Sequence, residues 1–159
     1  MNELIRLDNI SKSFEGHEVL SDITLSIKEN EFVTLLGPSG CGKTTTLRII
    51  GGFETPDTGR VIFEGRDITN VPPNQRHVNT VFQNYALFPH MTVQENIAFG
   101  LRVSGKSEQY IKDKIAYGLK LVNLDGYGKR TIDKMSGGQQ QRVAMARAIV
   151  NEPRALLLD

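Results

Sequence analysis

Alternation of polar and apolar residues marks the first part of the chain. It runs through residues 4–10 and again through residues 23–27, and a period of two predicts strands that are buried on one face. Residues 32–36 form an apolar run without alternation. Such a run is typical of a strand covered on both faces in a parallel sheet, so we expect a buried strand there.

Turn-forming residues divide the stretch that follows. A helix is expected over residues 43–50, where the glycines at 51–52 end it. A turn then leads into an expected strand at residues 60–64. Two prolines at 72–73 break the chain before another expected strand at residues 78–82.

The period of the apolar residues becomes helical after about residue 91. Three further helices are expected, over residues 93–103, 107–122 and 136–150. A last apolar segment, residues 155–159, predicts a strand. We therefore expect an α/β protein in which residues of about 91–135 form a helical subdomain, inserted into a core made of about residues 1–90 and 136–159.

The composition is that of an ordinary globular domain. Of the 159 residues 39% are hydrophobic, and the formal net charge of +1 disfavours a dedicated nucleic-acid binder without excluding a local phosphate site. The single cysteine, Cys41, cannot form an internal disulfide, which is compatible with a reducing compartment. No apolar run exceeds four residues, whereas a membrane-spanning helix needs roughly 20, and residues 1–10 contain no signal-peptide core. A cytosolic chain is expected, unless something else holds it at a membrane.

Residues 37–44 match the phosphate-binding pattern G-x-x-x-x-G-K-[ST] between an expected strand and an expected helix. The glycines let backbone N–H groups approach a triphosphate, and the helix N-terminus adds its positive dipole end. Lys43 supplies a charge for the outer phosphates and Thr44 a hydroxyl for Mg²⁺. The alternative is a glycine-rich turn with an incidental lysine. The residues expected to contact the nucleotide here are Gly37, Pro38, Ser39, Gly40, Cys41, Gly42, Lys43, Thr44 and Thr45.

A second pair of glycines follows a helix cap. Ser136 and Gln139 have capping-box spacing, which places Gly137 and Gly138 in the first turn of a helix. Glycine costs about 1 kcal/mol relative to alanine at each such position, so the pair suggests that something approaches the backbone closely. The segment is interpreted either as an anion site or as a plain serine cap with a tight packing contact.

Asp159 follows the apolar residues 155–158. A carboxylate at the carboxyl end of a buried strand, in a chain with a phosphate-binding loop, fits a ligand of Mg²⁺. The alternative is an aspartate that caps the next turn.

Taken in order, these motifs resemble the nucleotide-binding subunit of ATP-binding cassette (ABC) transporters over the whole chain. Residues 37–44 are similar to the Walker A loop of that family, residues 136–142 to its signature motif, and residues 155–159 to Walker B. The resemblance also implies that Gln83 is the glutamine of the Q-loop and that Phe14 is the aromatic residue that stacks on adenine.

A finer resemblance lies in residues 79–93, which are very similar to the spermidine/putrescine import ATPases. Relatives that import iron, maltose or other solutes share much of this stretch. The family resemblance implies head-to-tail pairing with a second ATPase subunit, in which each ATP lies between the Walker A loop of one subunit and residues 136–139 of the other. Permease subunits would keep the subunit at the cytoplasmic face of the cell membrane. A solute-binding protein would be an indirect partner through the permease, and no nucleic acid is expected as a partner.

The resemblance also implies a P-loop NTPase core with ATP and Mg²⁺ as cofactors. Catalytic roles then belong to Lys43 and Gln83. The implied metal ligands are Thr44, Gln83 and Asp159.

The sequence departs from the family pattern in three ways. Met135 stands where Leu is more common and Phe14 where Tyr is more common, and both changes are conservative. The third departure is the absence of the catalytic Glu and switch His that the family places after Walker B, since His17, His77 and His90 do not match. We therefore expect the N-terminal portion of one ABC ATPase domain, truncated at the Walker B strand and inactive or nearly so by itself.

Two alternatives remain open. One is a non-catalytic nucleotide-binding or interaction module; the other is a different P-loop enzyme, such as a small-molecule kinase or GTPase, against which residues 136–139 argue strongly. Poor stability is also expected, because Leu156 and its neighbours would be partly uncovered in a truncated sheet. The apolar residues expected either to contact the permease or to belong to the core are Tyr85, Leu87, Phe88 and Met91.

Overall fold

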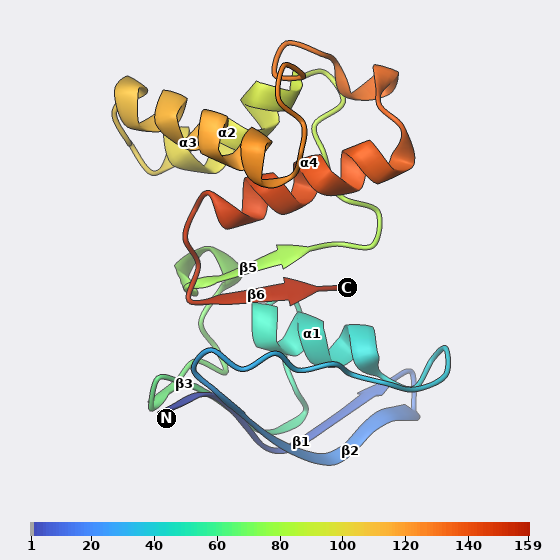
Figure 1. Ribbon diagram of the computed structural model, residues 1–159. Coiled ribbons are helices and arrows are strands. Elements are labelled where there is room, and N and C mark those ends of the chain that lie inside the picture. Colours follow the sequence, from blue (N-terminus) through green and yellow to red (C-terminus); the bar gives the residue numbers. More distant parts are fainter. Residues whose placement is uncertain (1) are drawn as a thin grey trace. The chain divides into compact units, whose positions relative to one another are not determined.

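The computed structural model of the protein describes residues 2–159, which form two compact units (Figure 1). The first unit contains residues 2–76 together with Asp159, and the second contains residues 77–158. Each unit has its own sheet. None of the helices formed by the described residues is long and apolar enough to span a membrane.

The first unit contains a four-stranded antiparallel sheet (Figure 1). Its strands are β1 (Glu3–Phe14), β2 (His17–Lys28), β3 (Thr58–Phe63) and β4 (Arg66–Asp67), in the spatial order β2-β1-β3-β4. Leu7 of β1 pairs with Leu25 and with Val61, and Leu7 and Val61 are fully buried. The antiparallel N-terminal region is thereby confirmed, although β1 and β2 extend beyond the alternating segments to a tight turn at residues 15–16.

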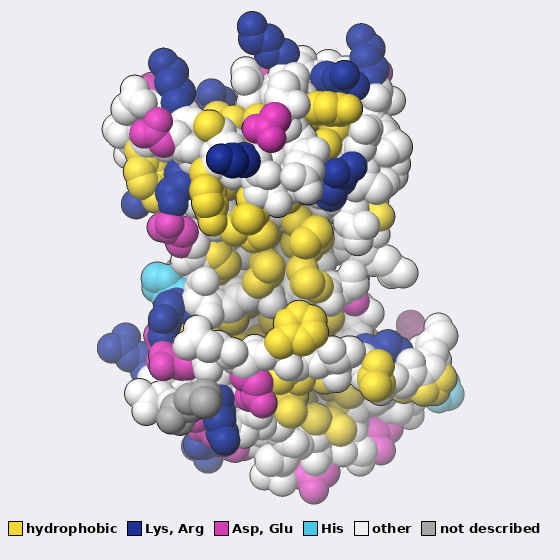
Figure 2. Space-filling model, in the orientation of Figure 1, with side chains coloured by type: hydrophobic (Ala, Val, Ile, Leu, Met, Phe, Trp, Pro, Cys, Tyr) yellow, Lys and Arg dark blue, Asp and Glu magenta, His cyan; other side chains and the backbone are white. Residues whose placement is uncertain are grey.

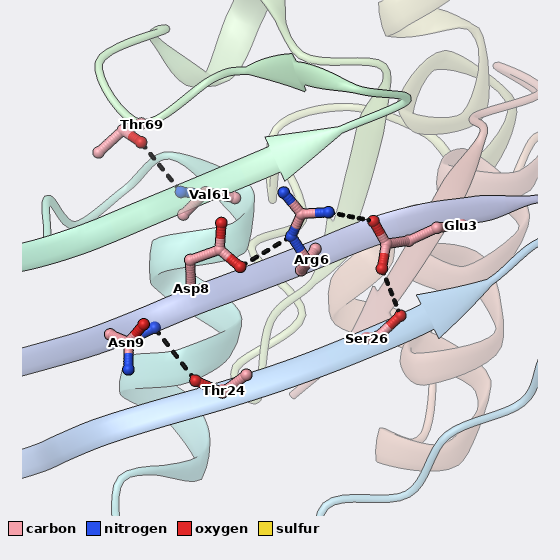
Figure 3. A network of polar contacts seen from close by, with 8 residues as sticks. All are labelled: Glu3, Arg6, Asp8, Asn9, Thr24, Ser26, Val61 and Thr69. Atoms are coloured by element: carbon pink, nitrogen blue, oxygen red, sulfur yellow. Dashed lines mark hydrogen bonds and ion pairs between the residues drawn. The ribbon is translucent and has the colours of Figure 1, made fainter.

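Polar side chains also connect the strands of this sheet (Figure 3). Arg6 donates hydrogen bonds to Glu3 at 2.9 Å and to Asp8 at 2.7 Å, and Glu3 accepts another from Ser26 of β2 at 2.7 Å. Exposed ion pairs of this kind contribute little to stability individually. Backbone hydrogen bonds between the strands and the burial of apolar side chains therefore contribute most to the stability of the sheet.

Helix α1 (Lys43–Gly51) is anchored at its C-terminus by an arginine that follows the short 3₁₀ helix η1 (Pro73–Gln75). The Arg76 guanidinium is buried and donates to the carbonyls of Ile49 and Ile50, both at 2.8 Å. Burial lowers the pKa of Arg76 from its ordinary value. The carbonyls, which carry the negative end of the helix dipole, stabilise the buried cation.

The expected buried strand at residues 32–36 is not formed. These residues are irregular, and Phe32 and Leu36 are 86% and 88% exposed. A central strand needs hydrogen-bonding neighbours along its edges, and no strand of the described residues pairs with this segment. The apolar run alone therefore did not determine a strand.

The second unit combines two parallel strands with three α-helices (Figure 1). The strands are β5 (Val78–Val81) and β6 (Ala155–Leu158); the helices are α2 (Val93–Val103), α3 (Glu108–Leu121) and α4 (Gly137–Ile149), with the short 3₁₀ helix η2 (Ile132–Lys134) before α4. Thr92, Ser107 and Ser136 cap the three helices through side-chain oxygens. These local caps explain why the helix boundaries agree closely with those expected from the sequence.

An apolar core is shared by the three helices. It includes Ile97 of α2, Ile111 of α3 and Val143 of α4. A Cβ atom at Gly118 of α3 would lie only 2.8 Å from Cγ1 of Val150, so glycine allows α3 to pack closely here. The helices of residues 91–135 thus share their core with α4; a separate subdomain with the expected bounds stays a prediction.

Strand β6 is exposed on part of its surface. Leu157 is buried, whereas Leu156 and Leu158 are 36% and 49% exposed. The expectation that this segment is partly uncovered is confirmed, while poor stability stays a prediction. Tyr85 and Leu87 are half-buried against the core, and Phe88 and Met91 are half-buried as well.

Candidate nucleotide-binding site

Two glycines of the loop at residues 37–44 stand where neighbouring atoms of the protein leave no room for a side chain. A Cβ at Gly42 would lie 2.5 Å from Cδ2 of Leu20, and Gly42 has a φ of +91°. A Cβ at Gly37 would lie 2.4 Å from Sγ of Cys41. From the sequence these glycines were expected to let a phosphate approach the backbone. Close contacts within the loop and with β2 are a second reason why these two positions exclude a side chain.

Lys43 begins α1 and lies across the loop. Its Nζ donates to the carbonyl oxygens of Gly37 and Pro38, both at 2.7 Å, and lies 3.5 Å from Sγ of Cys41. These acceptors are neutral, and a phosphate oxygen would offer the ammonium group a stronger, charge-assisted hydrogen bond. The lysine is therefore held at the loop by contacts that an anion can replace.

The N-terminus of α1 differs from those of the other α-helices. Its N-cap is Gly42, and no side chain caps it or places a negative charge in its first turn, whereas α2, α3 and α4 each have a side-chain cap. Its first N–H groups therefore have no side-chain acceptor within the described residues. Such N–H groups, with the positive end of the helix dipole, favour an anion.

Charge is distributed unevenly between the two units. The first unit has 8 Lys and Arg against 12 Asp and Glu, and the second has 11 against 6. Lys and Arg side chains are accordingly prominent over the helices of the second unit in Figure 2. Because the first unit is net negative, its affinity for a phosphate must come from the local donors of the loop and from Lys43.

Thr44 and Asp159 bring two oxygens together in the first unit. The Thr44 hydroxyl donates to Oδ1 of Asp159 at 2.7 Å. Adjacent ligands of an octahedral Mg²⁺, at about 2.1 Å from the ion, are about 3.0 Å apart, so this pair is close to the spacing of a Mg²⁺ site and has its hard-oxygen chemistry. Residues 2–159 contain no cluster of three or more His, Cys, Asp or Glu able to hold a metal.

The second glycine pair lies at an exposed helix N-terminus in the second unit. Ser136 accepts a hydrogen bond from the N–H of Gln139 at 3.3 Å, and the Gln139 side chain accepts one from the N–H of Ser136 at 3.0 Å, which completes the expected capping box. The serine oxygen is the acceptor, so its own hydroxyl hydrogen remains free to be donated. A Cβ at Gly137 or at Gly138 would meet nothing within 4 Å. The tight packing contact that was one interpretation of the pair is therefore not found among the described residues of the second unit.

Gln83 and Phe14 belong to different units. Gln83 is exposed in the turn that follows β5. In the same turn Tyr85 and Ala86 have φ values of +62° and +45°, and Arg147 of α4 donates to both of their carbonyls, at 2.9 and 2.7 Å. Phe14 ends β1 in the first unit and is 41% exposed.

Three residues near these motifs were not singled out from the sequence. They are Lys12 beside Phe14, Arg76 at the end of α1, and Arg147 behind the turn of Gln83. Only Lys12 had a signal, because residues two apart on a strand project from the same face. The two arginines bind backbone carbonyls far along the chain, for which the sequence has no pattern.

Comparison with known proteins agrees with the motifs. The family profile described as "ABC transporter" matches residues 20–159. The chain belongs to the ABC transporter family. The match includes the Walker A loop, the signature segment and Asp159, so the resemblance stated from the sequence is confirmed.

Curated relatives of this ABC cassette match nearly all of the chain. The spermidine/putrescine import ATP-binding protein PotA of Acetivibrio thermocellus is 62% identical over 158 residues, which is 99% of this chain and 45% of the relative. The protein of that name from Clostridium novyi is 61% identical over 156 residues, or 98% of this chain and 45% of the relative. The chain thus spans about half the length of the curated relatives that it matches.

Solved structures of ABC cassettes share the fold. A nucleotide-free ATP-binding cassette from an ABC transporter superposes with a TM-score of 0.87 at 29% identity, over 99% of this chain and 69% of that one. The dimeric post-hydrolysis state of the ATP-binding cassette MJ0796, bound to ADP and Pi, gives 0.88 at 32% identity, over 98% and 73%. The expected α/β class with a P-loop NTPase core is confirmed.

Proposed function

We propose that this ABC cassette is the ATP-binding part of an importer ATPase that drives polyamine uptake. The observation that carries the ATP site is the arrangement of the first unit. An uncapped helix N-terminus follows a glycine loop, Lys43 lies at that loop, and the Thr44–Asp159 pair is close to the spacing of Mg²⁺ ligands. The polyamine assignment is supported by the name of relatives that are about 60% identical over nearly the whole chain.

Each group has a distinct task in the proposed site. Loop N–H groups and Lys43 bind and orient the phosphate chain, while Phe14 offers its exposed ring to adenine. Thr44 and Asp159 hold Mg²⁺, which supplies positive charge to the outer phosphate oxygens. The role of Gln83, an exposed residue of the second unit, at the metal and at the attacking water is proposed from the family resemblance alone.

The proposal includes a second copy as partner. Ser136 and the open backbone of Gly137 and Gly138 present a hydroxyl and helix N–H groups that would bind the outer phosphate of an ATP held by the other copy. The dimeric state of the MJ0796 cassette supports this pairing. Permease subunits would receive the motion and keep the protein at the cytoplasmic face of the membrane.

Titration of the chain with MgATP tests the first part of the proposal. Lys43→Ala removes the charge at the loop and should weaken binding by at least about tenfold. Lys28→Ala, at an exposed position of β2, is the matched control and should leave binding unchanged. Equal affinities of the Lys43→Ala variant and the unchanged chain would contradict the ATP site.

Uptake in cells tests the second part. The full-length protein, expressed with its permease subunits as the sole polyamine importer, should support uptake of labelled spermidine and putrescine, and Lys43→Ala should abolish it. Loss of maltose or iron uptake in that variant, with polyamine uptake intact, would contradict the solute assignment while leaving the ATPase assignment standing.

A further inference from the structure

Lys12 lies against the ring of Phe14. The two residues are two positions apart on β1, and Nζ of Lys12 is 5.2 Å from the centroid of the Phe14 ring. The Lys12 side chain is only 13% exposed, whereas Phe14 is 41% exposed. An ammonium over an aromatic ring is attracted to its π electrons, so Lys12 holds the ring from one side.

Two carboxylates fix the ammonium in turn. Nζ of Lys12 lies 3.0 Å from Oε1 of Glu54 and 3.1 Å from Oδ1 of Asp57, and Oδ2 of Asp57 accepts the backbone N–H of Ser13 at 2.7 Å. The hydrogen bond with Glu54 raises the pKa of Lys12, and the Ser13 N–H, followed by Lys12, lowers the pKa of Asp57. Lys12 and Asp57 therefore both favour their charged forms.

This network connects the proposed adenine contact, Phe14, with the segment that follows the proposed phosphate-binding helix α1. Phe14 stands at the turn between β1 and β2, while Glu54 and Asp57 lie between α1 and β3. Helix α1 begins at the phosphate-binding loop. Within the first unit, Lys12 thus connects the aromatic platform with the segment that follows the phosphate-binding helix.

We propose that Lys12 is a positioning residue for recognition of the base. Its ammonium fixes the orientation of the Phe14 ring, so that the ring stacks on adenine without first losing rotational freedom. The proposal rests on the ATP site proposed above. It does not require Lys12 to contact the nucleotide, because Glu54 and Asp57 already neutralise its charge.

The test compares MgATP with magnesium tripolyphosphate, which has the phosphate chain but no base. Lys12→Met should weaken MgATP binding by about three- to tenfold and leave tripolyphosphate binding within about twofold. Lys12→Arg keeps a cation over the ring and should retain the MgATP affinity. The double variant Lys12→Met with Phe14→Ala should bind MgATP no more weakly than Phe14→Ala alone.

Several outcomes would overturn this inference. Lys12→Met would do so if it bound MgATP like the unchanged chain, or if the folded variant lost both ligands equally, as general repulsion by Glu54 and Asp57 would cause. If Lys12→Met does not fold, Asp57→Asn is the second variant, because it keeps Lys12 but removes the charge of one of its partners. It should weaken the binding of MgATP but not that of tripolyphosphate. Loss of MgATP binding in Phe14→Ala without any in the folded Lys12 and Asp57 variants would refute the role of Lys12 alone. Failure of the unchanged chain to bind either ligand would refute the ATP site itself.

Discussion

The hydroxyl of Thr44 donates a 2.7 Å hydrogen bond to Oδ1 of Asp159, a residue 115 positions further along the chain. One oxygen comes from the first turn of α1 and the other directly follows β6. Both are hard oxygen donors, and their separation is close to that of about 3.0 Å between neighbouring ligands of the proposed Mg²⁺. The contact therefore brings together two candidate site residues that are far apart in the sequence.

Thr44→Ala should remove most of the benefit that Mg²⁺ gives to ATP binding. The hydroxyl is lost, and of the Thr44–Asp159 pair only the carboxylate remains to hold the ion. We expect about tenfold weaker binding of MgATP, with little change for ATP in the presence of EDTA. Calorimetric titration under both conditions measures this, and Thr44→Ser, which keeps the hydroxyl, is the control. An equal loss with and without Mg²⁺ would contradict the metal role.

Replacing Gly137 and Gly138 by alanine should have opposite effects on stability and on association. Neither Cβ would meet an atom within 4 Å, and alanine is favoured in a helix by about 1 kcal/mol per position. The doubly substituted chain should therefore unfold at a higher temperature but lose ATP-dependent dimerisation, which sedimentation velocity measures. Unchanged dimerisation would mean that no partner approaches this backbone.

Arg76→Met should destabilise the first unit strongly. It leaves the carbonyls of Ile49, Ile50, Val71 and Thr69 without the donor that now lies 2.7–3.2 Å away. A loss of about 3 kcal/mol in the free energy of unfolding is expected from these buried acceptors, measured by urea denaturation. Arg48→Met, at an exposed position of α1, should change the free energy of unfolding by less than about 0.5 kcal/mol. Similar losses in both variants would refute the special role of the buried guanidinium.

Glu95 should make the stability of the second unit sensitive to acid. The N–H and the hydroxyl of Thr92 donate to its carboxylate, at 2.7 and 2.8 Å, and lower the pKa of Glu95. A carboxylate whose pKa is lowered on folding stabilises the fold above its unfolded pKa of about 4.3, and this contribution is lost as the pH falls through the folded value. Glu95→Gln should thus lower the melting temperature at pH 7, and this effect should shrink below about pH 4.3 and vanish once the pH is below the folded pKa. The same change at Glu108, in the first turn of α3, is the control; a pH-independent effect of Glu95→Gln would contradict the prediction.

The helices were the part of the fold that local sequence predicted well. Thr92, Ser107 and Ser136 bond to backbone groups only three residues away, so the signal and the structure occupy the same short segment. Residues 32–36 show the opposite case. Their apolar run predicted a buried strand, yet a strand forms only where another chain segment offers hydrogen bonds, and none does so here.

The sequence by itself determined which residues could hold phosphate and metal, because a glycine loop, a lysine, a hydroxyl and a carboxylate are matters of residue type and short spacing. Only the tertiary structure decided that Thr44 meets Asp159 and that Lys12 lies against Phe14 between two carboxylates. It also decided that no described residue of the second unit packs against Gly137 or Gly138. The physical reason is that these relationships depend on distances between atoms of distant segments. Such distances depend on how the sheet and helices pack, and hydrophobic periodicity in the sequence does not reveal them.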